Sequence, residues 1–180
     1  MRDFFAFLFE TIKIVILAIV IVLPVRYFLF QPFFVQGISM EPNFFNGDYL
    51  IVDEITYRFR DPQRGEVIVF KYPQSPTQRY IKRIIGLPGD EILIEDGQIT
   101  ITDDAGSWVL DETEYLKDAY TGGIAKISLS ETEYFVLGDN RDFSSDSRRW
   151  GSLSEEFIVG KVYLRAWPFT ALAKIESPAY

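Results

Sequence analysis

Hydrophobic and polar positions follow one pattern near the N-terminus and another in the rest of the chain. From Ile14 to Phe30 the residues are apolar except for Arg26 and the hydroxyl of Tyr27. A run of this kind approaches the ~20 residues that a helix needs to cross a bilayer. The pattern therefore predicts a membrane-spanning helix, either a permanent anchor or a cleaved secretory signal.

The residues after this run favour the permanent anchor. A cleavable signal has a shorter apolar core, followed by small residues at its cleavage site. Here the core is followed by bulky residues over 30–34, with the sequence FQPFF. Basic and acidic residues both precede the core, so the positive-inside rule leaves its orientation open.

Beyond this run, short stretches of β-branched and aromatic residues alternate with turn residues, a pattern typical of strands. The expected strands are 49–52, 66–70, 80–85, 91–94, 98–101, 134–137 and 160–166. Asp96-Gly97 lies between two of these strands and predicts a two-residue hairpin turn. The spacing predicts a mainly β fold, an antiparallel β barrel or sandwich, preceded by one N-terminal transmembrane helix.

This pattern divides the chain into two parts. Residues 1–31 are expected to form an N-terminal tip and the anchor, and residues 32–180 a β-rich domain. The stretch 102–132 is more polar and irregular and is the expected place for a small insertion. Residues 154–158 are expected to form a short helical turn.

Composition narrows the possible chemistry, because the 180 residues include no histidine and no cysteine. A Ser-His-Asp triad, a cysteine nucleophile, a zinc site built from His or Cys and a disulfide framework are therefore excluded. A serine nucleophile would need a carboxylate or a neutral lysine as its base. The chain has lysines at positions 13, 71, 82, 117, 126, 161 and 174.

Charge points away from nucleic acid as a partner, because the formal net charge is -8. Anionic lipid headgroups would also repel an acidic domain. Contact with a bilayer beyond the anchor should therefore use apolar and aromatic groups.

Ser39 lies nine residues beyond the apolar run, in the segment GISMEP over 37–42. Glycine and proline on either side predict a turn that presents the hydroxyl to a substrate. A serine beside glycine is more often an ordinary turn residue. Tethering to the run would place this hydroxyl at a membrane surface.

Lys82 lies in a strand-like stretch in which alternation puts Tyr80, Lys82 and Ile84 on one face. An ordinary lysine, with a pKa near 10.4, is neutral about once in every few thousand molecules at pH 7. Desolvation in a dry site lowers a lysine pKa by up to 3 to 5 units. The alternative to a catalytic base is a strand lysine that extends to solvent, as most lysines do.

A third segment, GDNRDFSSDSRRWG over 138–151, is rich in charge. Its simplest interpretation is a polar loop held by Asp-Arg pairs and Asx turns. A calcium loop fits poorly, because Arg141 and Phe143 fall where oxygen ligands should alternate. Within the loop, the Ser144 hydroxyl is placed to orient a neutral amine, and Asp146 is placed to pair with Arg148.

Together these segments resemble the type I signal peptidases, or leader peptidases, which are membrane-anchored serine proteases with a Ser/Lys dyad. The resemblance runs in order and spacing from about Gln31 to Phe169. It is carried by the segments Ser39-Met40-x-Pro42, Arg64 to Phe70, Tyr80-Ile81-Lys82-Arg83 with Gly86-x-Pro88-Gly89-Asp90, and Gly138 to Asp142 with Ser144-x-Asp146-Ser147-Arg148.

The resemblance implies that Ser39 is the nucleophile and Lys82 the general base, and that Ser144 hydrogen-bonds Lys82. It also implies that Asp146 and Arg148 hold the site, and that no metal or cofactor is needed. By the same resemblance, the substrate pockets would be lined by Phe33, Val35, Met40, Tyr80 and Ile81.

Three positions depart from the family pattern. Phe143 replaces the usual Asn, and Asn43 stands where Thr usually follows the proline. Gly37 occupies a position where some members carry a serine that contributes to the oxyanion hole. The Ser39 backbone N–H is then the expected first oxyanion donor, and the second donor is unassigned.

The function implied is removal of signal peptides from secretory preproteins by acyl transfer, with the substrate bound as an added strand. The enzyme would be a single-pass protein of the plasma or inner membrane, with its catalytic domain on the extracytoplasmic face. Two alternatives stay open: a membrane-anchored β module that binds peptide without bond cleavage, and a Ser/Lys peptidase dedicated to one partner or to self-cleavage.

Overall fold

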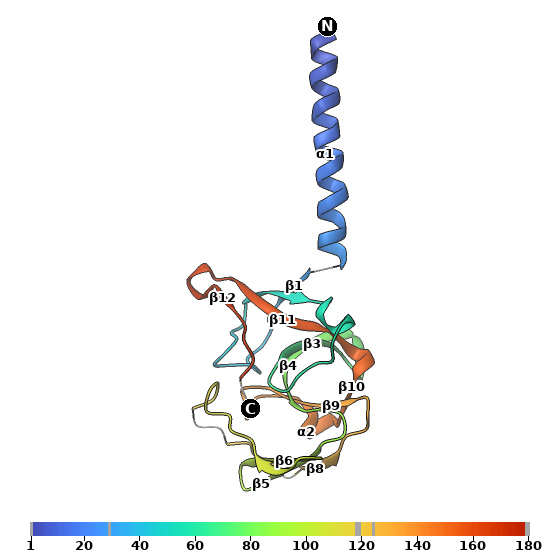
Figure 1. The fold of residues 1–180 in the computed structure, drawn as a ribbon. Helices are drawn as coiled ribbons and strands as arrows, with labels where there is room; N and C mark the ends of the chain where they lie inside the picture. Colours follow the sequence, from blue (N-terminus) through green and yellow to red (C-terminus); the bar gives the residue numbers. More distant parts are fainter. Residues whose placement is uncertain (1, 29, 118–119, 124, 179–180) are drawn as a thin grey trace.

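The computed structural model describes residues 2–28, 30–117, 120–123 and 125–178, and the side chains of residues 2, 3, 5, 6, 21–28, 30 and 125 lie outside that description. Helix α1 spans Arg2–Phe28 and projects away from a β-rich body (Figure 1). Within the described part of the chain, no helix combines the length and hydropathy of a membrane span. The predicted anchor, 14–30, extends into the stretch whose side chains lie outside the described residues.

The body contains an eight-stranded sheet and a four-stranded sheet, in which all strand pairs are antiparallel. The larger sheet has the order β1-β2-β11-β3-β4-β9-β10, with β12 paired to β11. Its strands are β1 (Phe30–Phe34), β2 (Tyr49–Asp53), β3 (Val67–Tyr72), β4 (Ser75–Gly86), β9 (Glu133–Leu137), β10 (Leu153–Ser154), β11 (Ile158–Trp167) and β12 (Ala173–Lys174).

The smaller sheet has the order β7-β6-β5-β8. Its strands are β5 (Glu91–Glu95), β6 (Gln98–Asp103), β7 (Gly106–Val109) and β8 (Ala125–Ser128). The predicted hairpin turn between β5 and β6 is confirmed, with φ of 51° at Asp96 and 80° at Gly97. The predicted insertion at 102–132 supplies β7 and β8, so it extends this sheet.

Short helices complete the fold: α2 (Ser147–Trp150) and the 3-10 helices η1 (Thr56–Arg58), η2 (Glu155–Phe157) and η3 (Phe169–Ala171). The expected helical turn over 154–158 is confirmed as η2. Each predicted strand is also present, although β4 and β11 are longer than expected. The residues of β1 were assigned to the end of the anchor and its flank, but they form an edge strand.

Three apolar clusters form the core of the body. Strand β3 contributes to two of them, because Val67 and Val69 face one cluster while Ile68 and Phe70 face another. The third cluster joins the sheets, since Ile85 of β4 packs with residues of β5, β6 and β9. Burial on both faces explains why the first four residues of β3, 67–70, are all apolar rather than alternating.

Candidate active site

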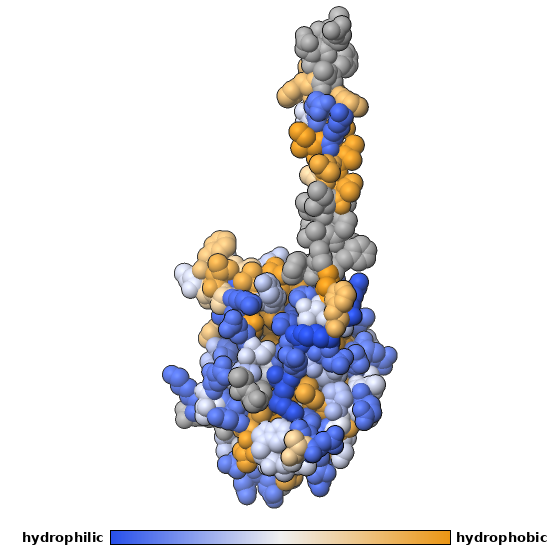
Figure 2. All heavy atoms as spheres, viewed as in Figure 1, coloured by the Kyte–Doolittle hydropathy of each residue, from blue (hydrophilic) through white to orange (hydrophobic). Residues whose placement is uncertain are grey.

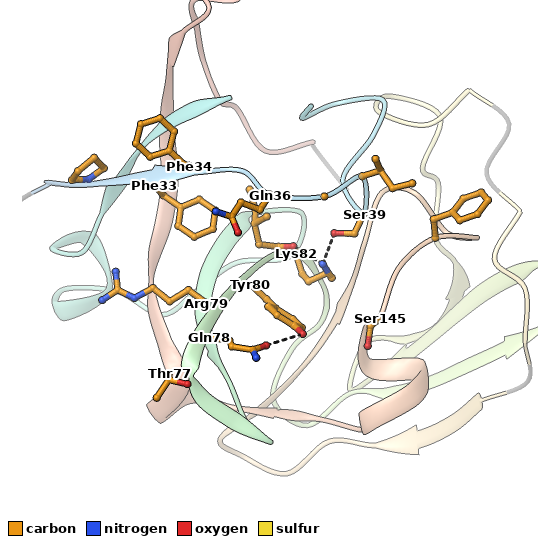
Figure 3. A pocket seen from close by; sticks show the side chains of 15 residues that line it. Phe33, Phe34, Gln36, Ser39, Thr77, Gln78, Arg79, Tyr80, Lys82 and Ser145 are labelled. Carbon is orange, nitrogen blue, oxygen red and sulfur yellow. Dashed lines mark hydrogen bonds between the residues drawn. The ribbon is translucent and has the colours of Figure 1, made fainter. Parts of the chain in front are cut away.

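The larger sheet leaves an open slot between β1 and the first half of β4. On one edge of β4, residues 79–83 pair with β3, while pairing with β9 on the other edge begins only at Arg83. Strand β1 pairs with β2 along one edge and lines the slot from the opposite side. The resulting hollow has a volume of about 840 Å³ (Figure 3). It is lined by residues 32–34, 36–39, 77–82, 143 and 145.

Ser39 lies at one end of this hollow, in the loop that follows β1. Gly37 has φ of 90°, a conformation that glycine adopts without strain, and its N–H donates to Asn46 Oδ1 at 3.0 Å. Met40, which follows Ser39, is buried in the core and fixes the other side of the turn. The loop therefore holds the Ser39 side chain at the surface of the hollow.

Lys82 enters the hollow from β4 and meets this serine. Its Nζ donates to Ser39 Oγ at 2.7 Å (Figure 3). It also donates to the Ile81 carbonyl oxygen at 2.8 Å. The lysine is only 3% exposed. Burial lowers its pKa from 10.5 to about 8, against the opposing attraction of Asp146 and Asp139. About a tenth of the Lys82 amines are then neutral at pH 7, far more than for an ordinary lysine.

Aromatic side chains form the dry wall beside this amine. The Tyr80 ring centroid lies 5.6 Å from Lys82 Nζ, and Tyr80 stacks on Tyr72 with ring centroids 4.5 Å apart. The Tyr80 ring adds apolar surface beside an amine that is itself buried, and burial of this kind lowers a lysine pKa. The alternation of Tyr80 and Lys82 along β4 therefore places both side chains as the sequence predicted.

The loop at 138–148 closes the other side of the site. Asp146 is fully buried and accepts from Arg148 Nε and Nη2, both at 2.8 Å, so the predicted pair is confirmed. Its carboxylate also accepts from the Gly138 N–H at 3.1 Å. Burial opposes ionisation of Asp146, but the Arg148 contacts outweigh burial and hold its pKa below the ordinary value.

The expected hydrogen bond from Ser144 to Lys82 is absent, and that prediction was wrong in detail. The Ser144 Oγ is buried and meets no strict hydrogen-bond geometry among the described residues, but it lies close enough to the Asp146 carboxylate to help lower the pKa of Asp146. Lys82 is instead oriented by Ser39 and by the Ile81 carbonyl. Ser144 packs against Gly138, where an added Cβ would overlap both the Ser144 side chain and the Ser39 carbonyl oxygen.

Two of the residues predicted to line the substrate pockets lie elsewhere in the structure. Phe33, Tyr80 and Ile81 line the hollow as expected. Val35 and Met40 instead belong to the apolar core, with exposed fractions of 3% and 1%, and do not line it.

A buried polar network behind the serine escaped the sequence analysis. Arg83 holds Asp139 through two hydrogen bonds of 2.9 and 2.7 Å, and Asn43 Nδ2 donates to the same carboxylate at 2.8 Å. This network ties the segment after Ser39 to β4 and to the loop at 138–148. Asp139 directly precedes Asn140, whose N–H donates to the Ser39 carbonyl at 3.1 Å.

A second buried ion pair links the loop at 138–148 to the segment between β7 and β8. Glu112 accepts from Arg141 Nη1 at 2.6 Å and from Nη2 at 2.5 Å, and Arg141 Nε donates to the Gly138 carbonyl at 3.0 Å. Glu112 lies in the stretch interpreted as an insertion, where no local pattern marks it. The Asp and Arg residues around Arg141 were the only sequence signal that this arginine pairs with a carboxylate.

The geometry combines a presented hydroxyl, a buried amine in contact with it and a fixed loop. While Lys82 is charged, its Nζ donates to Ser39 Oγ; when it is neutral, the same contact lets the hydroxyl donate to the amine lone pair. This arrangement is suited to nucleophilic attack by serine with an amine as base.

Comparison with known proteins supports this chemistry. The family model described as signal peptidase, peptidase S26, matches residues 8–167. The chain is 36% identical over 162 residues to a probable signal peptidase I-2 of Synechocystis, covering 87% of this chain and 72% of that protein. It is also 36% identical to signal peptidase I P of Bacillus subtilis subsp. natto, covering 88% of this chain and 89% of that protein.

A solved structure is similar in sequence as well. The crystal structure of a signal peptidase I from Enterococcus faecalis is 29% identical, with a TM-score of 0.48, and the match covers 57% of this chain and 97% of that one. The family match spans most of the described chain, including both strands that flank the hollow. The chain therefore belongs to the signal peptidase family, peptidase S26, and is a serine endopeptidase with signal peptidase I function.

Proposed function

We propose that Ser39 is the nucleophile and Lys82 the general base with which this signal peptidase cleaves secretory preproteins. The observation that carries this assignment is the 2.7 Å contact between Lys82 Nζ and Ser39 Oγ, made by a lysine that is almost fully buried. Because burial lowers the pKa of this lysine to about 8, a useful fraction of the amine is neutral at physiological pH.

The reaction proceeds through an acyl-enzyme. Neutral Lys82 takes the Ser39 proton while Oγ forms a bond to the scissile carbonyl carbon. The amide C–N bond then breaks, and the leaving nitrogen takes the proton from Lys82. A water molecule, deprotonated by the same amine, then attacks the ester carbonyl carbon. The C–Oγ bond breaks, Ser39 Oγ takes the proton back from Lys82, and the signal peptide leaves with a free carboxylate. The Ser39 backbone N–H is the expected donor to the developing oxyanion.

The substrate segment before the scissile bond occupies the slot between β1 and β4. Both flanking strands present backbone groups to the slot, so an extended peptide completes the sheet as an added strand. Alternate side chains of that peptide point to the same wall, which matches the small-x-small pattern of a signal cleavage site. Phe33, Tyr80 and Ile81 line the slot where these side chains would lie.

Asp146 and Arg148 have a supporting role. Their ion pair is anchored further by Arg148 Nη2, which donates to the Arg141 carbonyl at 2.6 Å. The pair fixes the loop against which Ser39 and Lys82 pack, and it does not contact the reacting atoms.

We also propose that residues 1–31 anchor the enzyme in the cell membrane and that residues 32–180 form the catalytic domain on the extracytoplasmic face. The apolar run from Ile14 supports the anchor, as do the exposed apolar side chains along the described part of α1. Apolar side chains also gather on the hairpin between β11 and β12, at the end of the domain nearest α1 (Figure 2). They include Trp167, Phe169 and Leu172, with exposed fractions of 52%, 73% and 58%. Groups of this kind suit contact with a bilayer surface.

Cleavage of a panel of preproteins in detergent tests this function. Ser39→Ala and Lys82→Ala should each abolish cleavage without changing the thermal unfolding of the domain. Lys126→Ala is the matched control, because Lys126 is an exposed lysine of the smaller sheet and should keep full activity. Full activity in either site variant would reject the dyad. Cleavage of one preprotein alone would indicate a dedicated peptidase, and cleavage of none would indicate a binding module.

A further inference from the structure

An exposed aromatic residue, Phe143, lies in the loop at 138–148 and does not contribute to the core. Phe143 is 68% exposed, yet it lines the same hollow as Ser39 and Lys82. Ile38, which precedes the nucleophile, lines that hollow too and is 44% exposed. Two large apolar side chains therefore face open solvent within the active site.

Hydrogen bonds fix Phe143 at the Ser39 end of the hollow. Asn140 donates from its N–H to the Ser39 carbonyl and from Nδ2 to the Ile38 carbonyl, both at 3.1 Å. The Phe143 N–H in turn donates to the Asn140 carbonyl at 3.2 Å. The phenyl ring is thus carried on a turn that is bonded directly to the nucleophile segment.

The opposite end of the hollow is marked by a different contact. Arg79 Nη1 donates to Gln31 Oε1 at 2.8 Å, so β4 and the β1 segment meet there. The slot runs from this contact to the Ser39–Lys82 pair (Figure 3). A peptide that fills the slot before the scissile bond must continue past Ser39, toward the loop that carries Phe143.

We propose that Phe143 and Ile38 form an apolar subsite for the leaving side of the substrate. This subsite contacts an apolar side chain within the first two residues after the scissile bond, and it favours preproteins whose mature chain begins with such a residue. The inference rests on the proposed function, because it takes the slot to hold the segment before the scissile bond. Closure of the phenyl ring against such a side chain removes apolar surface from water on both partners.

A competition assay with matched substrates tests the subsite. Two preproteins differ only in the first two residues after the scissile bond, with Leu at both positions in one and Ser at both in the other. The wild-type enzyme should prefer the Leu substrate about three- to tenfold in kcat/KM. Phe143→Asn should bring the ratio to within about twofold of unity, and Phe143→Leu should retain most of it. Phe59→Ala is the control, because Phe59 is 83% exposed outside the hollow and its removal should leave the ratio unchanged.

Several outcomes would overturn the subsite. An unchanged ratio in Phe143→Asn would do so, as would an equal loss of activity on both substrates, which would point to contact with lipid or detergent. Failure of the wild-type enzyme to cleave either substrate would instead count against the proposed function, so the two failures are distinguishable.

Discussion

The Glu112 carboxylate accepts two hydrogen bonds from the Arg141 guanidinium, at 2.6 and 2.5 Å. Both side chains are buried, with exposed fractions of 6% for Glu112 and 5% for Arg141. Arg141 also donates to the Gly138 carbonyl, so this pair connects the smaller sheet to the catalytic loop. Loss of one partner leaves the other charge buried and unpaired.

Glu112→Gln is therefore expected to destabilise the domain by about 3 kcal/mol. It should also lower kcat roughly ten- to hundredfold, because the loop beside Ser39 loses its support. Denaturant unfolding and preprotein cleavage measure the two effects. Glu91→Gln is the control: its pair with Lys126 is exposed, and its loss should change stability by less than about 1 kcal/mol. Equal effects in the two variants would contradict the role given to Glu112.

Gly138→Ala tests the close packing behind the nucleophile. A Cβ at this position would overlap the Ser39 carbonyl oxygen and the Ser144 side chain, so the serine must move. We expect kcat/KM to fall roughly a hundredfold, because small displacements of reacting groups have effects of that size. In Gly122→Ala the new Cβ makes only an ordinary contact with Tyr120 at 3.8 Å, so activity should be kept. Wild-type activity in Gly138→Ala would show that the loop adjusts freely.

Glu66 should make the domain sensitive to acid. Burial opposes ionisation of its carboxyl, but hydrogen bonds from Arg60 and the Gln63 backbone outweigh burial and lower its pKa from 4.5 to about 2. A lowered folded-state pKa stabilises the fold above the unfolded value, and this contribution is lost as the pH falls from about 4.5 toward 2. The contribution at neutral pH is on the order of 1 to 3 kcal/mol.

Unfolding free energies measured between pH 7 and pH 2 check this expectation. The wild-type domain should lose stability across the acid range, and Glu66→Gln should be less stable at pH 7 with a flatter dependence on pH. Parallel pH curves for the two proteins would show that Glu66 does not carry the effect.

Local patterns predicted the parts of this molecule that depend on neighbours in sequence. Alternation placed the strands, and the Asp96-Gly97 turn followed from residues that adopt positive φ. The segments containing Ser39 and Lys82 were found from their motifs, and the structure brings the two side chains into contact. β1 was missed because its apolar residues directly continue the N-terminal run.

Contacts across the fold could not be predicted in the same way. Glu112 and Arg141 are 29 residues apart, and their pairing depends on how the smaller sheet docks. Val35 was placed in the substrate slot by resemblance, but it follows the end of β1 and packs into the core, a position that depends on how the loop after β1 folds back. Ser144 was assigned to Lys82 by resemblance, whereas in the described structure Lys82 donates to Ser39 and Ile81, and the Ser144 hydroxyl lies toward Asp146.

Titration of the Lys82 amine decides whether this lysine can act as the base for Ser39. Lysine labelled with ¹⁵N at Nζ, in the full chain in detergent, gives a signal for each amine, and Lys82→Arg identifies the one of interest. If Lys82 is the base, its amine should show a midpoint near pH 8, the value to which burial lowers its pKa. A Lys82 midpoint near about 10.4 would contradict this assignment, because the base would then be charged in nearly every molecule at neutral pH.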